Sequence, residues 1–89
     1  MEKDFESYLI KRGYKTITEK GLPSTVYQYI KGINKVCEWE YTTWQSLADN
    51  IDLIIPLYDI GGRKEHLGNQ SNKTVINALK RYREFIRQL

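Results

Sequence analysis

The sequence has little of the chemistry that most metal and redox sites require. It contains one cysteine and one histidine, so it can form neither an intrachain disulfide nor a zinc site of the usual four-ligand kind. Cys37 falls on the apolar side of a predicted helix and is expected to be a small buried side chain. Its lone thiol fits a reducing compartment, and we expect a cytoplasmic protein that uses no metal and no cofactor.

Long apolar runs are missing as well. No segment approaches the roughly 20 apolar residues that a membrane-spanning helix needs, and the longest candidate, IDLIIPLY, contains Asp52 and Pro56. The N-terminal MEKDFESYL is acidic and polar and lacks the apolar region of a signal peptide. With 89 residues, 40% of them hydrophobic, we expect a single domain over 1–89 with one small core and no roomy enzyme pocket.

Signatures of catalytic sites are also absent. The segment GRKEHLG is not a P-loop, because it lacks the G-K-[ST] ending. Glu38 and Glu40 flank Trp39 in a way that suits a helix end better than a catalytic dyad. His66 lies in a basic loop, where we expect it to be exposed, with a phosphate contact as its one alternative role. We therefore predict a protein that is not an enzyme and has no small-molecule substrate.

The apolar residues recur mainly at helical spacing along the sequence. No segment alternates between apolar and polar residues with a period of two. This predicts an all-α fold, a compact bundle of four to five helices. Residues 4–12 form the first helix, with Phe5, Tyr8 and Leu9 on one face and Gly13 as its stop.

Two short helices are predicted in the middle of the chain. The first begins at TTWQSLAD, capped by Thr42 or Thr43. The second covers 51–58, with a break or bend near Pro56 because proline removes a backbone donor. The segment GGRKEHLGNQ that follows is expected to be a basic, turn-rich loop.

Two long amphipathic helices are the most regular elements. Ser24 or Thr25 caps the first, and Gln28 can complete a capping box with Thr25. Its inward residues are Val26, Tyr29, Ile30, Ile33, Val36 and Cys37. Ser71 caps the last helix, which runs to about Gln88. Its inward residues are Val75, Leu79, Tyr82, Ile86 and Leu89.

Positive charge is concentrated in the C-terminal third. Residues 1–50 contain seven Lys/Arg and seven Asp/Glu, whereas residues 60–89 contain seven Lys/Arg and two Asp/Glu. Arg63 and Lys64 precede the last helix, near its positive N-terminal end, where phosphates bind readily. Backbone donors at 71–74 are expected to add phosphate contacts. The distribution favours a polyanionic partner, with a merely solvated surface as the alternative.

The last helix also carries a regular basic stripe. Lys73, Lys80 and Arg87 are seven residues apart, with Arg83 beside them, and the spacing places them away from the apolar face. Asn77 falls on the same outer side, and asparagine can pair with adenine.

Three motifs along the chain resemble a known family. The chain has F-x-x-Y-L, then S-T-V-Y-x-Y-I-x-x-I, then a short helix, then S-x-x-T-V-x-x-A-L-x-x-Y-x-x-F. This pattern resembles the N-terminal core-binding (SAM-like) domain of tyrosine recombinases and phage integrases, over nearly the whole chain. The matching residues are Phe5, Tyr8 and Leu9; Ser24, Thr25, Val26, Tyr27, Tyr29, Ile30 and Ile33; and Ser71, Thr74, Val75, Ala78, Leu79, Tyr82 and Phe85.

The resemblance implies a helical module that grips double-stranded DNA, largely through phosphates, during DNA integration or recombination. By the same resemblance, the DNA-binding positions are Thr25, Gln28, Lys31, Lys73, Asn77, Lys80 and Arg81. Together with Arg63 and Lys64 they form the predicted interface.

The catalytic residues of a recombinase are not in this sequence. That chemistry uses arginines, a lysine, histidines and a nucleophilic tyrosine in a separate domain, and the spacing H-x-x-R from His66 reaches Asn69 instead. The chain is therefore a fragment of a larger recombinase or a free-standing relative with a changed task.

A protein-interaction module of phage or mobile-element origin, such as an inhibitor of a host defence enzyme, is the alternative. The chain begins with Met, which suits a free-standing protein. Tyr27, Trp39 and Tyr41 are expected to form a partly exposed aromatic patch for such a partner.

Overall fold

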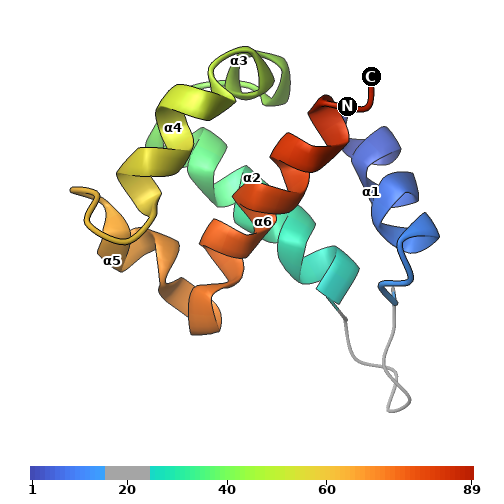
Figure 1. Cartoon of the computed structure of the whole chain (residues 1–89), viewed down its shortest axis with the longest axis horizontal. Coiled ribbons are helices and arrows are strands. Elements are labelled where there is room, and N and C mark those ends of the chain that lie inside the picture. Colours follow the sequence, from blue (N-terminus) through green and yellow to red (C-terminus); the bar gives the residue numbers. More distant parts are fainter. Residues whose placement is uncertain (16–24) are drawn as a thin grey trace.

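The computed structural model of the chain describes residues 1–15 and 25–89. Over these residues it contains six helices and no strand, which confirms the all-α prediction (Figure 1). The sixth helix arises because the segment predicted as a loop contains a one-turn helix. The helices are α1 (Glu2–Lys11), α2 (Thr25–Trp39), α3 (Trp44–Asp49), α4 (Ile51–Tyr58), α5 (Glu65–Gly68) and α6 (Gln70–Ile86). Among these described helices, none is long and apolar enough to cross a membrane.

The two long helices α2 and α6 cross at the centre of the molecule, with α1 on one side and α3, α4 and α5 on the other (Figure 1). Gly32 sits at the crossing. A Cβ at this position would lie 3.2 Å from the Cβ of Ala78 and 3.6 Å from the Cα of Val75. The absent side chain therefore lets the two helices approach closely, although glycine is a poor helix former.

The core is formed by the predicted inward faces of these helices together with large aromatic rings. Val26, Ile33 and Val36 of α2 are fully buried. Phe5 packs its ring against those of Tyr82, Phe85 and Trp44, with centroids 5.2, 5.7 and 5.9 Å away. The buried hydroxyl of Tyr82 donates a hydrogen bond to the carbonyl oxygen of Trp44 (2.8 Å), which offsets the cost of burying a polar group.

Two helix ends follow the sequence predictions. Gly13 has φ +96°, its N–H donates to Ile10 and the N–H of Tyr14 donates to Leu9, so α1 ends in a Schellman motif. Thr43 is the N-cap of α3, where its hydroxyl accepts from the N–H of Ser46 (3.2 Å).

The predicted loop after α4 is instead a compact segment held against that helix. The N–H of Lys64 donates to the carbonyl of Leu57 (2.8 Å), and α5 follows directly. Gly68 is so close to α4 that a Cβ there would lie 2.0 Å from the carbonyl oxygen of Tyr58. Of the break or bend predicted near Pro56, the break is absent, since α4 continues through Pro56 to Tyr58. Pro56 is exposed, so water can replace the backbone bond that it cannot make.

The beginning and end of the last helix differ from the prediction. Ser71, Asn72 and Lys73 have φ of 55°, 57° and 67°, in the left-handed region. The right-handed part therefore begins at Thr74, and Ser71 is not its cap. The physical reason is the position of Gly68: the chain must turn sharply after α5, and the left-handed residues make this turn. At the other end α6 stops at Ile86, so Leu89, predicted to be inward, is 77% exposed.

Candidate nucleic-acid interface

The predicted DNA-binding residues of α2 lie on its outer face. Thr25 is the first residue of the helix, while Ser24, the other predicted cap, falls outside the described residues. Gln28 and Lys31 are exposed. Both line a surface hollow of about 440 Å³, which is bordered by Tyr27, Gln28, Ile30, Lys31 and Asn34. This hollow offers an amide, an ammonium group and an aromatic ring side by side.

Several cations of the predicted interface and of the basic stripe are engaged with carboxylates of the same chain. The ammonium Nζ of Lys80 lies 3.4 Å from Oδ2 of Asp59, just after α4. The guanidinium Nη2 of Arg87 lies 3.4 Å from Oδ1 of Asp52 in α4. Lys64 pairs with Glu40 at the end of α2. Each of these cations is therefore already paired with a carboxylate within the fold.

The basic stripe predicted along the last helix is consequently not present as one free surface. Lys80 and Arg87 border α4, because the two aspartates that pair with them belong to that helix and its C-terminal flank. Lys73 lies in the left-handed turn. A seven-residue spacing places side chains on one stripe only within a continuous right-handed helix. Lys73 therefore does not lie on the same stripe as Lys80 and Arg87.

Arg81 is held toward α1 and α2. Its guanidinium lies 3.0 Å from a carboxylate oxygen of Glu84. A hydrogen bond with Tyr14 and the charge of Glu84 outweigh partial burial and raise the pKa of Arg81 further. Tyr14 in turn packs edge-on against the ring of Tyr29, 5.6 Å away. These contacts assign Arg81 a structural role in joining α6 to its neighbours.

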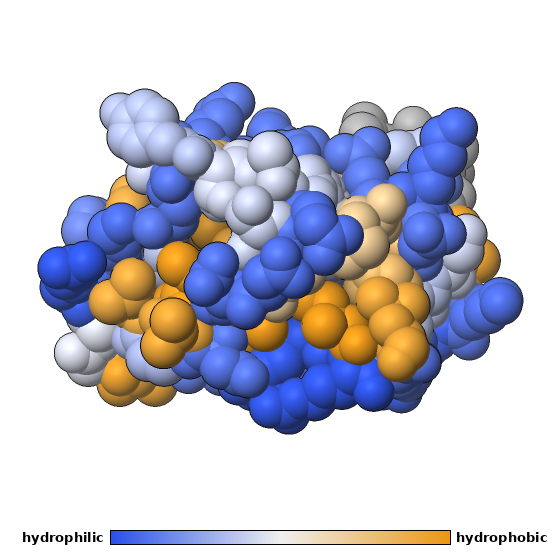
Figure 2. Space-filling view, turned by 90° about the horizontal axis from the view of Figure 1, so that it is seen from above, coloured by the Kyte–Doolittle hydropathy of each residue, from blue (hydrophilic) through white to orange (hydrophobic). Residues whose placement is uncertain are grey.

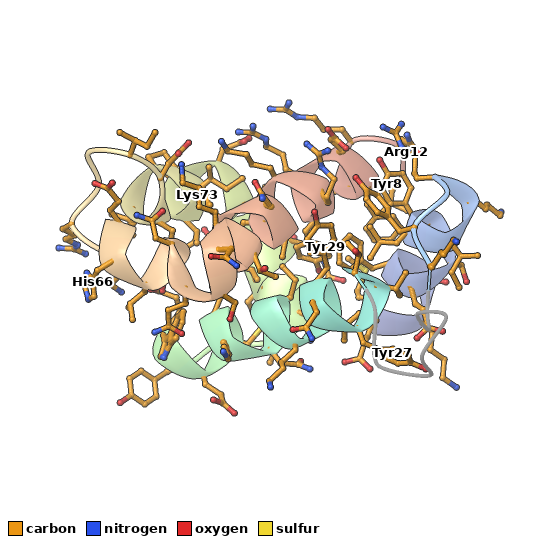
Figure 3. All side chains as sticks on the ribbon, turned by 90° about the horizontal axis from the view of Figure 1, so that it is seen from below. Tyr8, Arg12, Tyr27, Tyr29, His66 and Lys73 are labelled. Atoms are coloured by element: carbon orange, nitrogen blue, oxygen red, sulfur yellow. The ribbon has the colours of Figure 1, made fainter. Side chains whose placement is uncertain are left out.

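Three predicted cations remain exposed and form no ion pair with any residue that the structure describes. They are Lys31 on α2, Arg63 after α4, and Lys73 in the turn before the regular part of α6. His66 and Asn77 are exposed as well, which confirms the expectation for His66. Figure 3 shows Lys73 and His66 at one end of the molecule and Tyr27, which borders the α2 hollow, toward the other. Lys73 and His66 thus lie away from Tyr27, which lines the same hollow as Lys31.

The aromatic patch predicted for a protein partner does not form. Tyr41 is 97% exposed, but Trp39 is half-buried and stacks on Tyr58 with centroids 6.1 Å apart. Tyr27 lies 12 residues before Trp39 on the same helix, a distance of about 18 Å along its axis. The prediction of a single patch is therefore wrong.

A polar network around Glu40 was not predicted. The hydroxyl of Tyr58 donates to Oε2 of Glu40 (2.6 Å), and the ammonium group of Lys64 donates to the same oxygen. Burial alone raises the pKa of Glu40, but hydrogen bonds from Lys64 and Tyr58 and the charges of Lys64 and Arg63 outweigh it and hold this pKa below its ordinary value. The network joins the end of α2 to α4 and to the segment before α5. No local sequence pattern indicates it, because Glu40 lies 18 residues before Tyr58 and 24 residues before Lys64.

Acid should weaken this network. A group whose pKa is lowered by folding stabilises the fold above its ordinary pKa, and this contribution disappears as the pH falls through the lowered pKa. We expect the free energy of unfolding to begin to decline at about pH 5, just above the ordinary carboxylate pKa of roughly 4.3. It should decline further as the pH falls. Glu40→Gln should cost about 1–3 kcal/mol at neutral pH and flatten this decline in urea titrations. Glu38→Gln, at an exposed neighbour, is the control, and equal acid sensitivity of the two variants would contradict the assignment.

Residues 1–15 and 25–89 contain no group of three or more His, Cys, Asp or Glu side chains placed to hold a metal ion. Comparisons with protein-family models, with curated proteins and with solved structures each find no match to this chain. The functional assignment therefore rests on the geometry above and on the resemblance of its motifs.

Proposed function

We propose that the chain is a non-catalytic cytoplasmic module that binds double-stranded DNA, similar in task to the core-binding domain of a tyrosine recombinase or integrase. In such an arrangement the chemistry of DNA integration belongs to a separate domain. The observation that carries the proposal is the set of exposed cations at Lys31, Arg63 and Lys73, which have no carboxylate partner among the described residues.

These three cations suit phosphate contacts better than reading of bases. Lysine and arginine on flexible stems bind phosphates regardless of sequence and position a protein on the duplex. Gln28 and Asn34 beside Lys31, and Asn77 after Lys73, supply amides that can add hydrogen bonds to phosphates or base edges. Lys80 and Arg81 contribute less in this arrangement, because binding DNA would require them to leave Asp59 and Glu84.

Charge-removing variants test this assignment. In fluorescence anisotropy with a duplex of arbitrary sequence, Lys31→Ala, Arg63→Ala and Lys73→Ala should each weaken binding. Each should also lower the slope of log affinity against log salt by about 0.9, the change expected for one lost phosphate contact. Lys80→Ala and Arg81→Ala should change the slope by less.

The matched control is Lys3→Ala, which removes an exposed cation of α1 outside the predicted interface. If it weakens binding as much as Lys31→Ala, the affinity reflects net charge and not these positions. Unchanged slopes in all three interface variants would contradict the proposal.

A further inference from the structure

A groove with an apolar floor lies between α3, α4 and the turn that precedes them. It has a volume of about 240 Å³, and Leu47 is buried in it while Leu53 is 73% exposed at its edge. The groove is lined by Glu40, Thr42, Ser46, Leu47, Asn50, Leu53 and Ile54.

The residue beside this groove is an exposed tyrosine in an unfavourable backbone conformation. Tyr41 has φ 53°. Its N–H donates to Glu38 and the N–H of Thr42 donates to Cys37, which is the Schellman geometry that ends α2. Glycine is preferred at this position, because a side chain on a left-handed residue meets the backbone. The ring of Tyr41 is 97% exposed, so packing within the fold does not account for an aromatic residue here.

The outer face of α4 continues this apolar surface. Leu53 and Pro56 are exposed on the helix, and Ile60, just beyond it, is 78% exposed. Figure 2 views the molecule from the side of α3 and α4 and shows hydrophobic side chains gathered over α4 (orange, left). An exposed apolar patch of this kind typically marks a protein contact.

Charge indicates what covers it. Between Lys35 and Arg63 the chain carries five carboxylates, at positions 38, 40, 49, 52 and 59, and no lysine or arginine. Three of them, at positions 40, 52 and 59, form ion pairs with cations from later in the chain. Glu38 and Asp49 are exposed and form no ion pair with the part of the chain that the structure describes. We infer that this surface, from Tyr41 across the groove to Leu53, binds a basic amphipathic helix of a partner protein. Its apolar residues would enter the groove, and its lysines or arginines would face the carboxylates of Glu38 and Asp49.

This inference is independent of DNA binding. The cations proposed to contact DNA are Lys31, Arg63 and Lys73, and none of them lines the groove. A variant that loses the partner helix should therefore keep its affinity for duplex DNA, which separates failure of one proposal from failure of the other.

Two designed peptides of about 18 residues provide the probe. Both place leucines at helical i, i+3, i+4 and i+7 spacing, and one carries flanking lysines where its twin carries glutamates. By fluorescence anisotropy, the lysine peptide should bind at least about tenfold more tightly than the glutamate peptide. Equal binding of the two peptides, or binding of neither, would overturn the inference.

Three variants locate the site. Leu53→Lys should weaken binding of the lysine peptide at least about tenfold, whereas Leu89→Lys, the same change at a similarly exposed residue, should leave it unchanged. Tyr41→Gly should weaken binding and also raise Tm by about 2–6 °C, because glycine relieves the left-handed residue. A Tm rise with unchanged binding would overturn the role of Tyr41. Concentration-dependent self-association that Leu53→Lys abolishes would assign the surface to a second copy of the chain and overturn the partner helix.

Discussion

Gly68→Ala is expected to lower the free energy of unfolding by about 3 kcal/mol, at the upper end of the cost of overpacking. A Cβ at this position would lie 2.0 Å from the carbonyl oxygen of Tyr58 and 3.3 Å from its Cβ. No rotamer relieves a contact between a Cβ and a backbone oxygen, so α5 must move away from α4. That movement also disturbs the neighbouring network of Glu40, Lys64 and Tyr58.

Thermal and urea unfolding followed by circular dichroism measure this loss, which corresponds to a fall in Tm of roughly 12–24 °C for a domain of this size. Gly13→Ala is the matched control, because its Cβ would meet nothing within 4 Å although φ is +96°. It should cost only the left-handed conformation, about 1–2 kcal/mol. Equal losses for the two variants would show that α5 does not pack on α4 as described.

Leu79→Ala should be the second large effect, at about 2–5 kcal/mol, because it leaves a cavity where α6 meets the core. Leu79 is fully buried, as its place in the apolar stripe predicts. Urea titration gives the loss directly, and the slope of the titration should stay unchanged if only stability is affected.

Asn77→Ala is the control on the same helix, since Asn77 is exposed and should change stability by less than about 0.5 kcal/mol. A loss under about 1 kcal/mol for Leu79→Ala would mean that α6 presents a different face to the core.

Periodicity predicted the parts of the fold that depend on one helix at a time. The inward residues of α2 follow from apolar spacing, and Gly13 and Thr43 end and begin their helices as local chemistry requires. α5 and the left-handed turn after it depend on the contact between Gly68 and Tyr58. That contact joins two segments in space, and no local pattern encodes it.

The candidate site was less predictable for the same reason. The partners of Lys80 and Arg87 are Asp59 and Asp52, which lie 21 and 35 residues earlier in the chain. Spacing along α6 describes where its cations point but carries no information about a carboxylate on a neighbouring helix. Tyr41 gave no signal either, because left-handed helix ends are recognised in sequences by glycine or asparagine.

The most direct test of DNA binding is the anisotropy of a labelled duplex of about 20 base pairs, measured with the wild-type chain at about 50 and about 200 mM salt. Three phosphate contacts predict a slope near −2.7, so the affinity should fall roughly fortyfold between these conditions. That result would place Lys31, Arg63 and Lys73 against a phosphate backbone. No binding at either salt concentration, or binding that salt does not weaken, would contradict the proposed function.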